Sequence, residues 1–273
     1  MKAKLLVATL GVLAVTYAFA APHNTIIDTT LGTSTRDGAL NAGEYGNLTY
    51  FSSGTGSGFG NVLGSNSKIY WDSSYAGGAL NLGIQLGGGG LFDRGVIYID
   101  SVAGGFADTT TINDNGDPGR AAISGNGTGG GTSELTFAAG FNPDYAITIE
   151  DGFAGLFQLN AGGAGSLGFV TTLNFTPTGN PSLQQREGEL LLSDIGLLAG
   201  DSFKWVATYL NSGNAFRSDE LNGQDTLPGG NIGNNPFTFD NYNLVQSVPE
   251  PATTTLLGVG LLAGVSWMRR KRA

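Results

Sequence analysis

The chain has 273 residues, of which 46 are glycine and 13% are charged, and it contains no cysteine and only one histidine, His23. These counts exclude cysteine-type zinc sites, thiol catalysis and multi-histidine metal sites, and the place of His23, close to the N-terminus, argues against a Ser-His-Asp triad. All 22 acidic residues but only seven of the 13 basic ones lie between Asp28 and Glu250, so we expect this segment to repel phosphate backbones and to have no nucleic-acid partner.

The N-terminus has the pattern of a secretory signal peptide. Lys2 and Lys4 precede an uncharged apolar run over residues 5–19, and Ala18 and Ala20 form an A-x-A cleavage site. The run is short for a membrane-spanning helix, which needs about 20 apolar residues. We therefore expect a signal helix over residues 1–20 that signal peptidase removes, with an uncleaved anchor as the alternative. Because the exported remainder has no disulfide, its stability must come from its core and from any metal ion it binds.

Residues 21–247 have the composition of one glycine-rich, acidic all-β domain. Short runs of β-branched, aromatic or alternating apolar residues recur between Gly, Asn and Asp turns, which favours strands over helices. We expect an antiparallel β-sandwich of two sheets, with at most a short helical turn over 190–198. In the clearest run, Phe203, Trp205 and Tyr209 share one face, and we expect Trp205 in the core. The expected strands cover residues 25–30, 48–51, 68–72, 79–86, 95–100, 134–138, 145–150, 155–159, 169–175, 189–192, 202–210 and 237–245.

Several short motifs follow one another in a familiar order. Residues 37–46 read DGALNAGEYG, and they are followed by IYWD at 69–72, VIYID at 96–100 and RSDE at 217–220. This order resembles the DOMON-like sandwich, which includes family 9 carbohydrate-binding modules, in which a DG-x-L-x-x-x-E-Y start precedes a strand that displays the ligand face. The resemblance implies a jelly-roll type of sandwich and a sugar ligand. One branch of that group binds haem through Met and His, which this chain cannot do, because Met1, Met268 and His23 lie outside the resembling segment.

Trp71, Asp72 and Arg217 are the candidate ligand-binding residues of this domain. A sugar site needs an exposed aromatic face beside a few polar groups. Trp71 lies next to Asp72 in an expected strand, and Tyr70 must face the opposite side. A tryptophan in the middle of a strand more often fills the core, and that alternative stays open.

Four oxygen-bearing side chains lie close together in the loop over 113–119. Asn113, Asp114, Asn115 and Asp117 could supply ligands to Ca²⁺, which takes about six to eight oxygens. The EF-hand pattern is not met, because Pro118 stands where the sharp-turn glycine belongs and the closing glutamate is absent. An ordinary Asn/Asp/Gly turn explains the same residues. Calcium is therefore a candidate ion, and we expect no other cofactor.

Carboxylate pairs are the remaining candidates for catalysis, as in glycosidases. Glu187 lies near Glu189 and Asp219 precedes Glu220, but spacing in the sequence cannot bring particular carboxylates together. We interpret all four as solvated charges and expect that the protein is not an enzyme.

The C-terminus, residues 248–273, carries the most specific motif of the chain. Pro249, Glu250 and Pro251 precede an uncharged stretch over 252–268. That stretch has the minimum length for a single transmembrane helix, and a basic tail after it favours a cytoplasmic C-terminus. The tail consists of Arg269, Arg270, Lys271 and Arg272. The arrangement closely resembles the PEP-CTERM sorting signal recognised by exosortases; a simple tail anchor is the alternative.

The PEP-CTERM resemblance implies an export route and partners. It implies a Gram-negative bacterium that makes an exopolysaccharide, and an exosortase that reads Pro249, Glu250 and Pro251. It also implies a transient tether in the inner membrane and a final place at the cell surface or in the extracellular matrix. We expect a structural or exopolysaccharide-associated component, and the alternative is a carbohydrate-binding module of the cell surface, with or without calcium.

Overall fold

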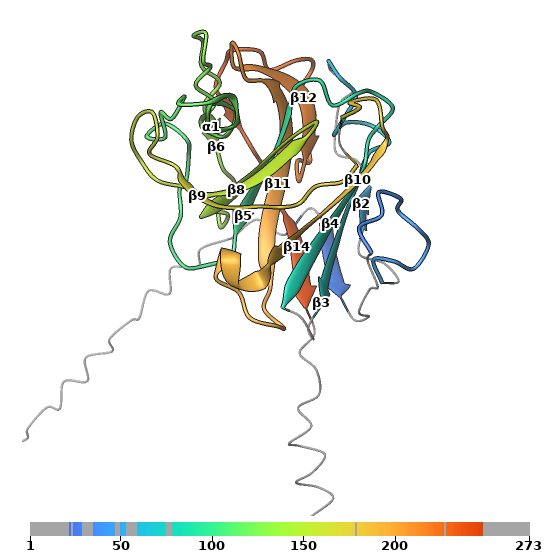
Figure 1. The fold of residues 1–273 in the computed structure, drawn as a ribbon. Helices are drawn as coiled ribbons and strands as arrows, with labels where there is room; N and C mark the ends of the chain where they lie inside the picture. Colours follow the sequence, from blue (N-terminus) through green and yellow to red (C-terminus); the bar gives the residue numbers. More distant parts are fainter. Residues whose placement is uncertain are drawn as a thin grey trace, which may run out of the picture.

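Two β-sheets lie face to face and enclose an apolar core (Figure 1). The structure is a computed structural model that describes residues 22, 24–28, 35–46, 50–52, 59–74, 78–177, 179–226 and 228–247. The larger sheet has eight strands in the order β1-β14-β11-β5-β7-β8-β9, with β12 paired to β11, and the smaller sheet has the order β10-β4-β3-β2. Both predicted terminal helices lie outside the described residues, and no helix within those residues is long and apolar enough to cross a membrane.

The elements have the following bounds. The larger sheet contains β1 (Asn24–Asp28), β5 (Arg94–Asp100), β7 (Tyr145–Glu150), β8 (Phe153–Gln158), β9 (Gly168–Thr172), β11 (Phe203–Asn211), β12 (Phe216–Asn222) and β14 (Asn243–Ser247). The smaller sheet contains β2 (Tyr50–Ser52), β3 (Lys68–Ser74), β4 (Ala79–Gln85) and β10 (Gln185–Leu191). Two short strands, β6 (Leu135–Thr136) and β13 (Phe237–Thr238), form a separate pair, and the helical elements are α1 (Pro118–Ser124) and the 3-10 turn η1 (Leu192–Ile195).

The predicted all-β sandwich is confirmed, with three differences. The pairs β1–β14 and β6–β13 are parallel rather than antiparallel. A parallel pair needs a long connection between its strands, and the strands of each pair are far apart in the sequence. The segment expected as one strand over 237–245 forms two, β13 and β14. Strand β12 and helix α1 were not predicted, whereas the helical turn expected within 190–198 is η1.

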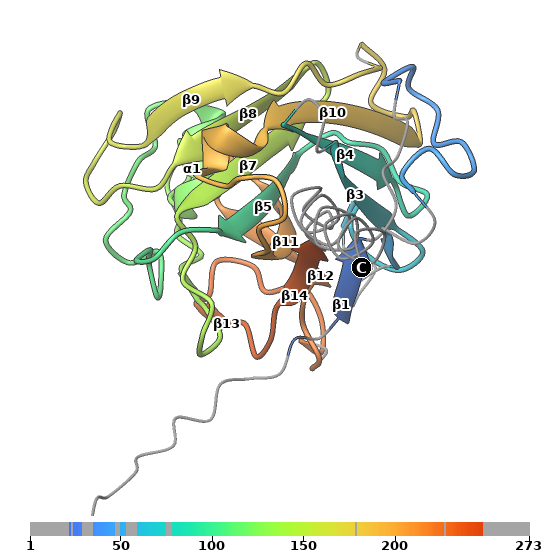
Figure 2. The same ribbon diagram turned by 90° about the horizontal axis from the view of Figure 1, so that it is seen from below.

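The core between the two sheets is built around two tryptophans. Trp71 on β3 and Trp205 on β11 are both fully buried, and their ring centroids lie 6.0 Å apart. Phe203 packs edge-on against Trp71 at 5.2 Å. Figure 2 shows the strands of the smaller sheet across this interior from β5, β11 and β14. The expectation that Trp205 fills the core is confirmed.

The larger sheet is covered on its outer face as well. Val96 and Tyr98 of β5 belong to a second apolar cluster, which also contains Ile123 of α1 and Phe137 and Phe239 from the neighbouring loops. The hydroxyl of Tyr98 donates a hydrogen bond of 2.5 Å to the carbonyl of Ile123, which fixes α1 on the sheet. Because β5 is buried on both faces, its sequence is a continuous apolar run, VIYI at 96–99, rather than an alternation of apolar and polar residues.

Candidate functional site

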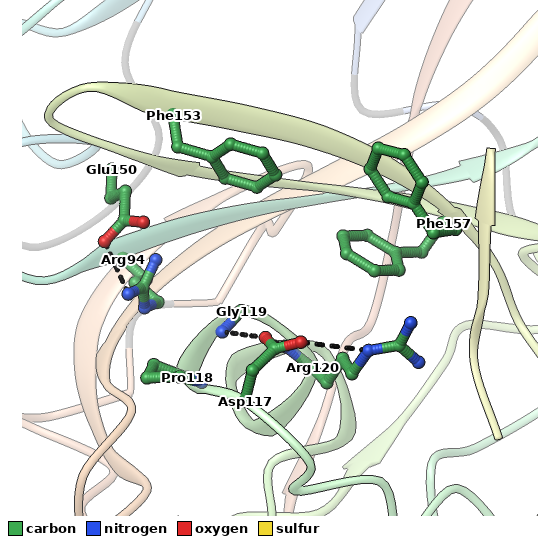
Figure 3. A pocket seen from close by; sticks show the side chains of 9 residues that line it. Arg94, Asp117, Pro118, Gly119, Arg120, Glu150, Phe153 and Phe157 are labelled. Carbon is green, nitrogen blue, oxygen red and sulfur yellow. Dashed lines mark hydrogen bonds and ion pairs between the residues drawn. The ribbon is translucent and has the colours of Figure 1, made fainter. Parts of the chain in front are cut away.

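A pocket of about 410 Å³ opens on the outer face of the larger sheet, between α1 and strands β7 to β9 (Figure 3). Aromatic side chains form one wall, and the first turn of α1 and two arginine–carboxylate pairs form the other. The pocket is lined by Arg94, Asp117, Pro118, Gly119, Arg120, Glu150, Phe153, Phe157 and Phe169.

The aromatic wall depends on the alternation of strand β8. Phe153, Gly155 and Phe157 occupy every second position and therefore share the outer face of the sheet. A Cβ atom at Gly155 would lie 2.6 Å from a ring carbon of Phe153 and 3.1 Å from one of Phe157, so only glycine leaves room for both rings. Phe169 on β9 meets Phe157 edge-on at 5.4 Å and is 51% exposed. The three rings form an apolar strip that reaches solvent.

The charged groups of the pocket are paired with each other. Arg94 forms an ion pair with Glu150, which lies at the end of the neighbouring strand. The Nε atom of Arg120 lies 2.9 Å from a carboxylate oxygen of Asp117, and its guanidinium lies over the ring of Phe157, 5.1 Å from the centroid. Two cations and two anions therefore face the pocket, which presents hydrogen-bonding groups without a net charge.

Helix α1 holds Arg120 in place through its own N-terminus. Asp117 is the N-cap, and its Oδ1 atom accepts hydrogen bonds from the amides of Gly119 (2.8 Å) and Arg120 (3.0 Å). Pro118 occupies the first turn, where its missing N–H is not needed. Gly119 allows the helix to approach β7, since a Cβ there would lie 3.0 Å from the Cγ2 atom of Thr148.

Asp114 connects this helix to the loop before β9. Its buried carboxylate accepts hydrogen bonds from the amides of Gly116 (3.0 Å), Gly165 (2.7 Å) and Leu167 (2.8 Å), and from Arg120 (2.8 Å). Burial alone would raise the pKa of Asp114, but these donors outweigh it and hold the pKa below its usual range. The carboxylate is therefore ionised and fully engaged within the fold.

The loop over 113–119 does not have the arrangement of the predicted calcium site. The guanidinium of Arg120 binds both Asp114 and Asp117 and stands where a cation would stand. The remaining two candidates, Asn113 and Asn115, are exposed. The alternative interpretation, a turn, describes the loop better, with the addition that it ends in a helix cap.

The residues predicted to bind sugar are all buried, so this prediction is wrong. Trp71 packs between the sheets, and Asp72 and Arg217 are buried as well. Arg217 donates to the Oγ1 atom of Thr208 (3.0 Å) and to the carbonyl of Ser133 (3.1 Å), and burial lowers its pKa. A ligand cannot stack on a ring that has no exposed surface. The sequence signal for the actual aromatic strip is F-x-G-x-F at 153–157.

Two of the carboxylates that we interpreted as solvated are buried, and that interpretation is wrong for them. Glu220 accepts hydrogen bonds at one oxygen from the amides of Val62 (2.7 Å), Leu63 (2.7 Å) and Gly64 (3.2 Å). Burial raises the pKa of Glu220 despite these donors. Glu189 and Asp219 are partly exposed, as expected for solvated charges.

Glu187 is the second buried carboxylate, and it lies in an acidic cluster. One oxygen each of Asp37, Glu44 and Glu187 lie within 4.8 Å of one another. Glu187 accepts from the amide of Gly38 (2.7 Å) and the hydroxyl of Tyr45 (3.0 Å). The segment 37–46 is thereby fixed across β10.

The comparisons with known proteins concern the C-terminus. Residues 247–271 match the PEP-CTERM protein-sorting motif. No curated protein matches the chain, and no solved structure does. The resemblance to DOMON-like sandwiches therefore stays a prediction. Pro249, Glu250, Pro251 and the basic tail lie outside the described residues. The chain carries a PEP-CTERM sorting motif, which marks it as an exported, membrane-passing protein that an exosortase processes and that ends up on the cell surface.

Proposed function

We propose that this protein is an exopolysaccharide-associated component of the surface or extracellular matrix of a Gram-negative bacterium. In this proposal, the domain holds a sugar polymer in the pocket between α1 and β7 to β9. The sorting motif at 247–271 supports the location, and the aromatic strip of the pocket supports the ligand.

The proposed route has three steps. Signal peptidase removes residues 1–20 after export. The apolar stretch over 252–268 and the basic tail then tether the chain in the inner membrane, with the tail in the cytoplasm. The exosortase finally cuts beside Pro249, Glu250 and Pro251 and thereby releases the folded domain from its anchor.

The aromatic strip is the observation that carries the sugar proposal. Sugar rings have apolar C–H faces and polar rims, and ligand sites that suit them combine apolar surface with a few polar groups. Phe169 offers an exposed ring, the guanidinium of Arg120 and the carboxylate of Asp117 lie across from the rings, and Glu150 lies beside Phe153 (Figure 3). Because the charges of the pocket balance, we propose a neutral polymer rather than a polyuronate as its ligand.

A purely structural matrix role is the second candidate, and hydrolysis is disfavoured. An exposed aromatic strip beside polar groups distinguishes a binding protein from an inert one, and the pocket has such a strip. A glycosidase needs one carboxyl group that can give up a proton at working pH. Asp117 caps α1 and pairs with Arg120, and Glu150 pairs with Arg94, so both carboxylates are already held in structural contacts. We therefore propose a protein that binds sugar without cleaving it.

Affinity electrophoresis of the processed protein through gels that contain the organism's purified extracellular polysaccharide tests this proposal. We expect Phe169→Ala to weaken binding about tenfold or more, since a phenyl ring in contact with a ligand contributes ~1.5–3 kcal/mol of apolar burial. Phe92→Ala is the matched control, because Phe92 is 73% exposed and is not among the residues that line the pocket. Equal retardation of both variants and the unaltered protein would contradict the pocket as the sugar site.

A further inference from the structure

Three exposed aliphatic side chains gather at one end of the sandwich. Leu198 is 74% exposed, Leu191 is 48% exposed and Val102 is 37% exposed. We name these three residues the apolar end. Among the described residues, the other large exposed apolar side chains are Phe92, which precedes β5, and Phe169 and Val170 on β9.

The strand register places the apolar end beside the last residues of β14. Phe203 of β11 pairs with Val245 of β14 in antiparallel register, so the loop before β11, which contains Leu198, lies beside Ser247. Lys204 also pairs with Asp100, so the loop after β5, which contains Val102, lies at the same end. In Figure 1 the gold helical turn η1 and the end of β14 lie together at the lower end of the molecule.

Short contacts hold the loops of the apolar end together. The hydroxyl of Ser101 donates to the carbonyl of Ile195 at 2.6 Å. A Cβ at Gly196 would lie 2.5 Å from a methyl carbon of Val102, so glycine is needed for this approach. Ile195 is fully buried and anchors the turn in the core. The loops after β5 and β10 therefore form one surface.

Both exposed leucines begin tight turns of the same kind. The amide of Leu191 donates to the side chain of Asp194 (3.1 Å), and the amide of Leu198 donates to the side chain of Asp201 (2.7 Å). The adjacent side chains of Leu192 and Leu197 are buried. The exposed leucines are thus held outward on a fixed backbone, at a cost in hydration that a lipid contact would offset.

The short segment between β14 and the apolar stretch keeps the apolar end close to the membrane. Only residues 248–251 separate Ser247 from the uncharged stretch over 252–268. Four extended residues span at most about 15 Å. With the stretch inserted in a bilayer, the apolar end therefore lies within reach of the lipid headgroups.

We propose that Leu191, Leu198 and Val102 contact the outer surface of the inner-membrane bilayer while the chain is tethered, and so orient the segment that the exosortase reads. This inference rests on the tethered intermediate of the proposed function. Asp194 and Asp201 lie beside the two leucines, so the contact favours zwitterionic over anionic headgroups. Aliphatic side chains on turns partition into the interface in proportion to the apolar area they bury.

Site-specific fluorescence in vesicles tests the contact. Because the chain has no cysteine, one cysteine at Ala199→Cys labels the exposed neighbour of Leu198, and Thr128→Cys labels the loop beside Ser212 at the far end of β11. Residues 21–273 are reconstituted in phosphatidylcholine vesicles that contain a lipid quencher near the headgroup. We expect quenching of the dye at position 199 but not at 128, and weaker quenching when phosphatidylglycerol replaces phosphatidylcholine.

Substitutions separate lipid contact from mere proximity. The double variant Leu191→Ser/Leu198→Ser should lose the quenching at position 199, whereas Phe92→Ser should retain it. Both alter exposed side chains, so both should keep the circular dichroism spectrum of the parent.

Vesicle flotation after alkaline extraction measures insertion of the C-terminal stretch independently. A chain that does not insert overturns both the tethered intermediate and this inference. A chain that inserts without quenching at position 199 overturns this inference alone. Shielding of position 199 only after an exosortase is added would show that the surface contacts the protease, which also overturns the lipid contact.

Discussion

Buried charged residues connect parts of this chain that are far apart in sequence. Glu220 binds the amides of residues 62–64, and Glu187 binds the segment 37–46. Arg186, also buried, forms an ion pair of 3.0 Å with Asp151 and donates to the carbonyls of Pro177 (2.6 Å) and Asn180 (2.8 Å). Each of these groups satisfies backbone atoms of a loop that would otherwise leave the sheets unattached.

The protonation of Glu187 gives the stability of the fold a measurable pH dependence. Burial raises the pKa of Glu187 above its usual range, and the nearby Glu44 and Asp37 raise it further, against the hydrogen bonds donated by Gly38 and Tyr45. A raised carboxyl pKa contributes stability below the unfolded-state pKa, and this contribution is lost as the pH rises through the folded-state pKa.

We therefore expect the stability of the Glu187→Gln variant, relative to that of the unaltered protein, to increase as the pH rises. The amide cannot ionise, so the variant should gain stability relative to the unaltered protein between pH 4.5 and neutrality. Urea unfolding at several pH values measures this difference. Glu189→Gln, which makes the same substitution at a partly exposed position of the same strand, is the matched control. A difference for Glu187→Gln that stays constant with pH would contradict the assignment.

These residue-scale connections could not be predicted from the sequence. Glu187 and Glu220 are charged residues in an acidic chain, and their partners lie more than 100 residues away. Local pattern predicts a solvated carboxylate in both cases, because it contains no information on which loop packs against which strand. Trp71 was ambiguous for the related reason that alternation along a strand does not say which face is covered.

Strands with regular alternation were predictable, and elements that depend on buried polar groups were not. Most strands with apolar runs lie within a few residues of their expected bounds, as β5 and β7 do. Strand β12 reads FRSDELN, a largely polar sequence, yet its Arg217, Ser218, Glu220 and Asn222 are buried. Helix α1 had a usable signal, since Asp117 and Pro118 form an N-cap and first turn, and Gly125 forms a left-handed C-cap.

At the scale of the element, Gly155 on β8 determines whether the aromatic wall can form. We expect Gly155→Ala to weaken retention by the polysaccharide gel, because the new methyl group displaces the ring of Phe153, which lies closest to it. The free energy of unfolding should change by less than about 1 kcal/mol, because Phe153 is partly exposed and can swing outward. Gly163→Ala is the control, as its added methyl group meets no atom within 4 Å. If both variants bind as the unaltered protein does, Gly155 has no role in the site.

At the scale of the whole molecule, the sandwich separates a sorting end from a binding face. The chain leaves the sheet at Ser247, beside the apolar end, and the sorting motif follows at once. The pocket lies on the outer face of the larger sheet, where Arg94 begins β5 and Glu150 ends β7, at the opposite ends of these strands from Asp100 and Tyr145. A domain tethered by its C-terminus can therefore keep the Arg94–Glu150 side of the pocket directed away from the membrane.

The intact mass of the protein recovered from the cell surface tests the central claim, that an exosortase sorts this chain through its C-terminal motif. Rigid prolines and one carboxylate beside the membrane are the distinctive chemistry that a protease could read, whereas insertion depends only on hydropathy and charge. We expect the surface protein to begin after residue 20 and to end beside Pro249, Glu250 and Pro251, without residues 252–273. Glu250→Ala should leave the chain inserted in the inner membrane with Arg269–Arg272 still attached. A surface protein that retains the basic tail, or a Glu250→Ala variant that is trimmed and delivered like the unaltered chain, would contradict the claim.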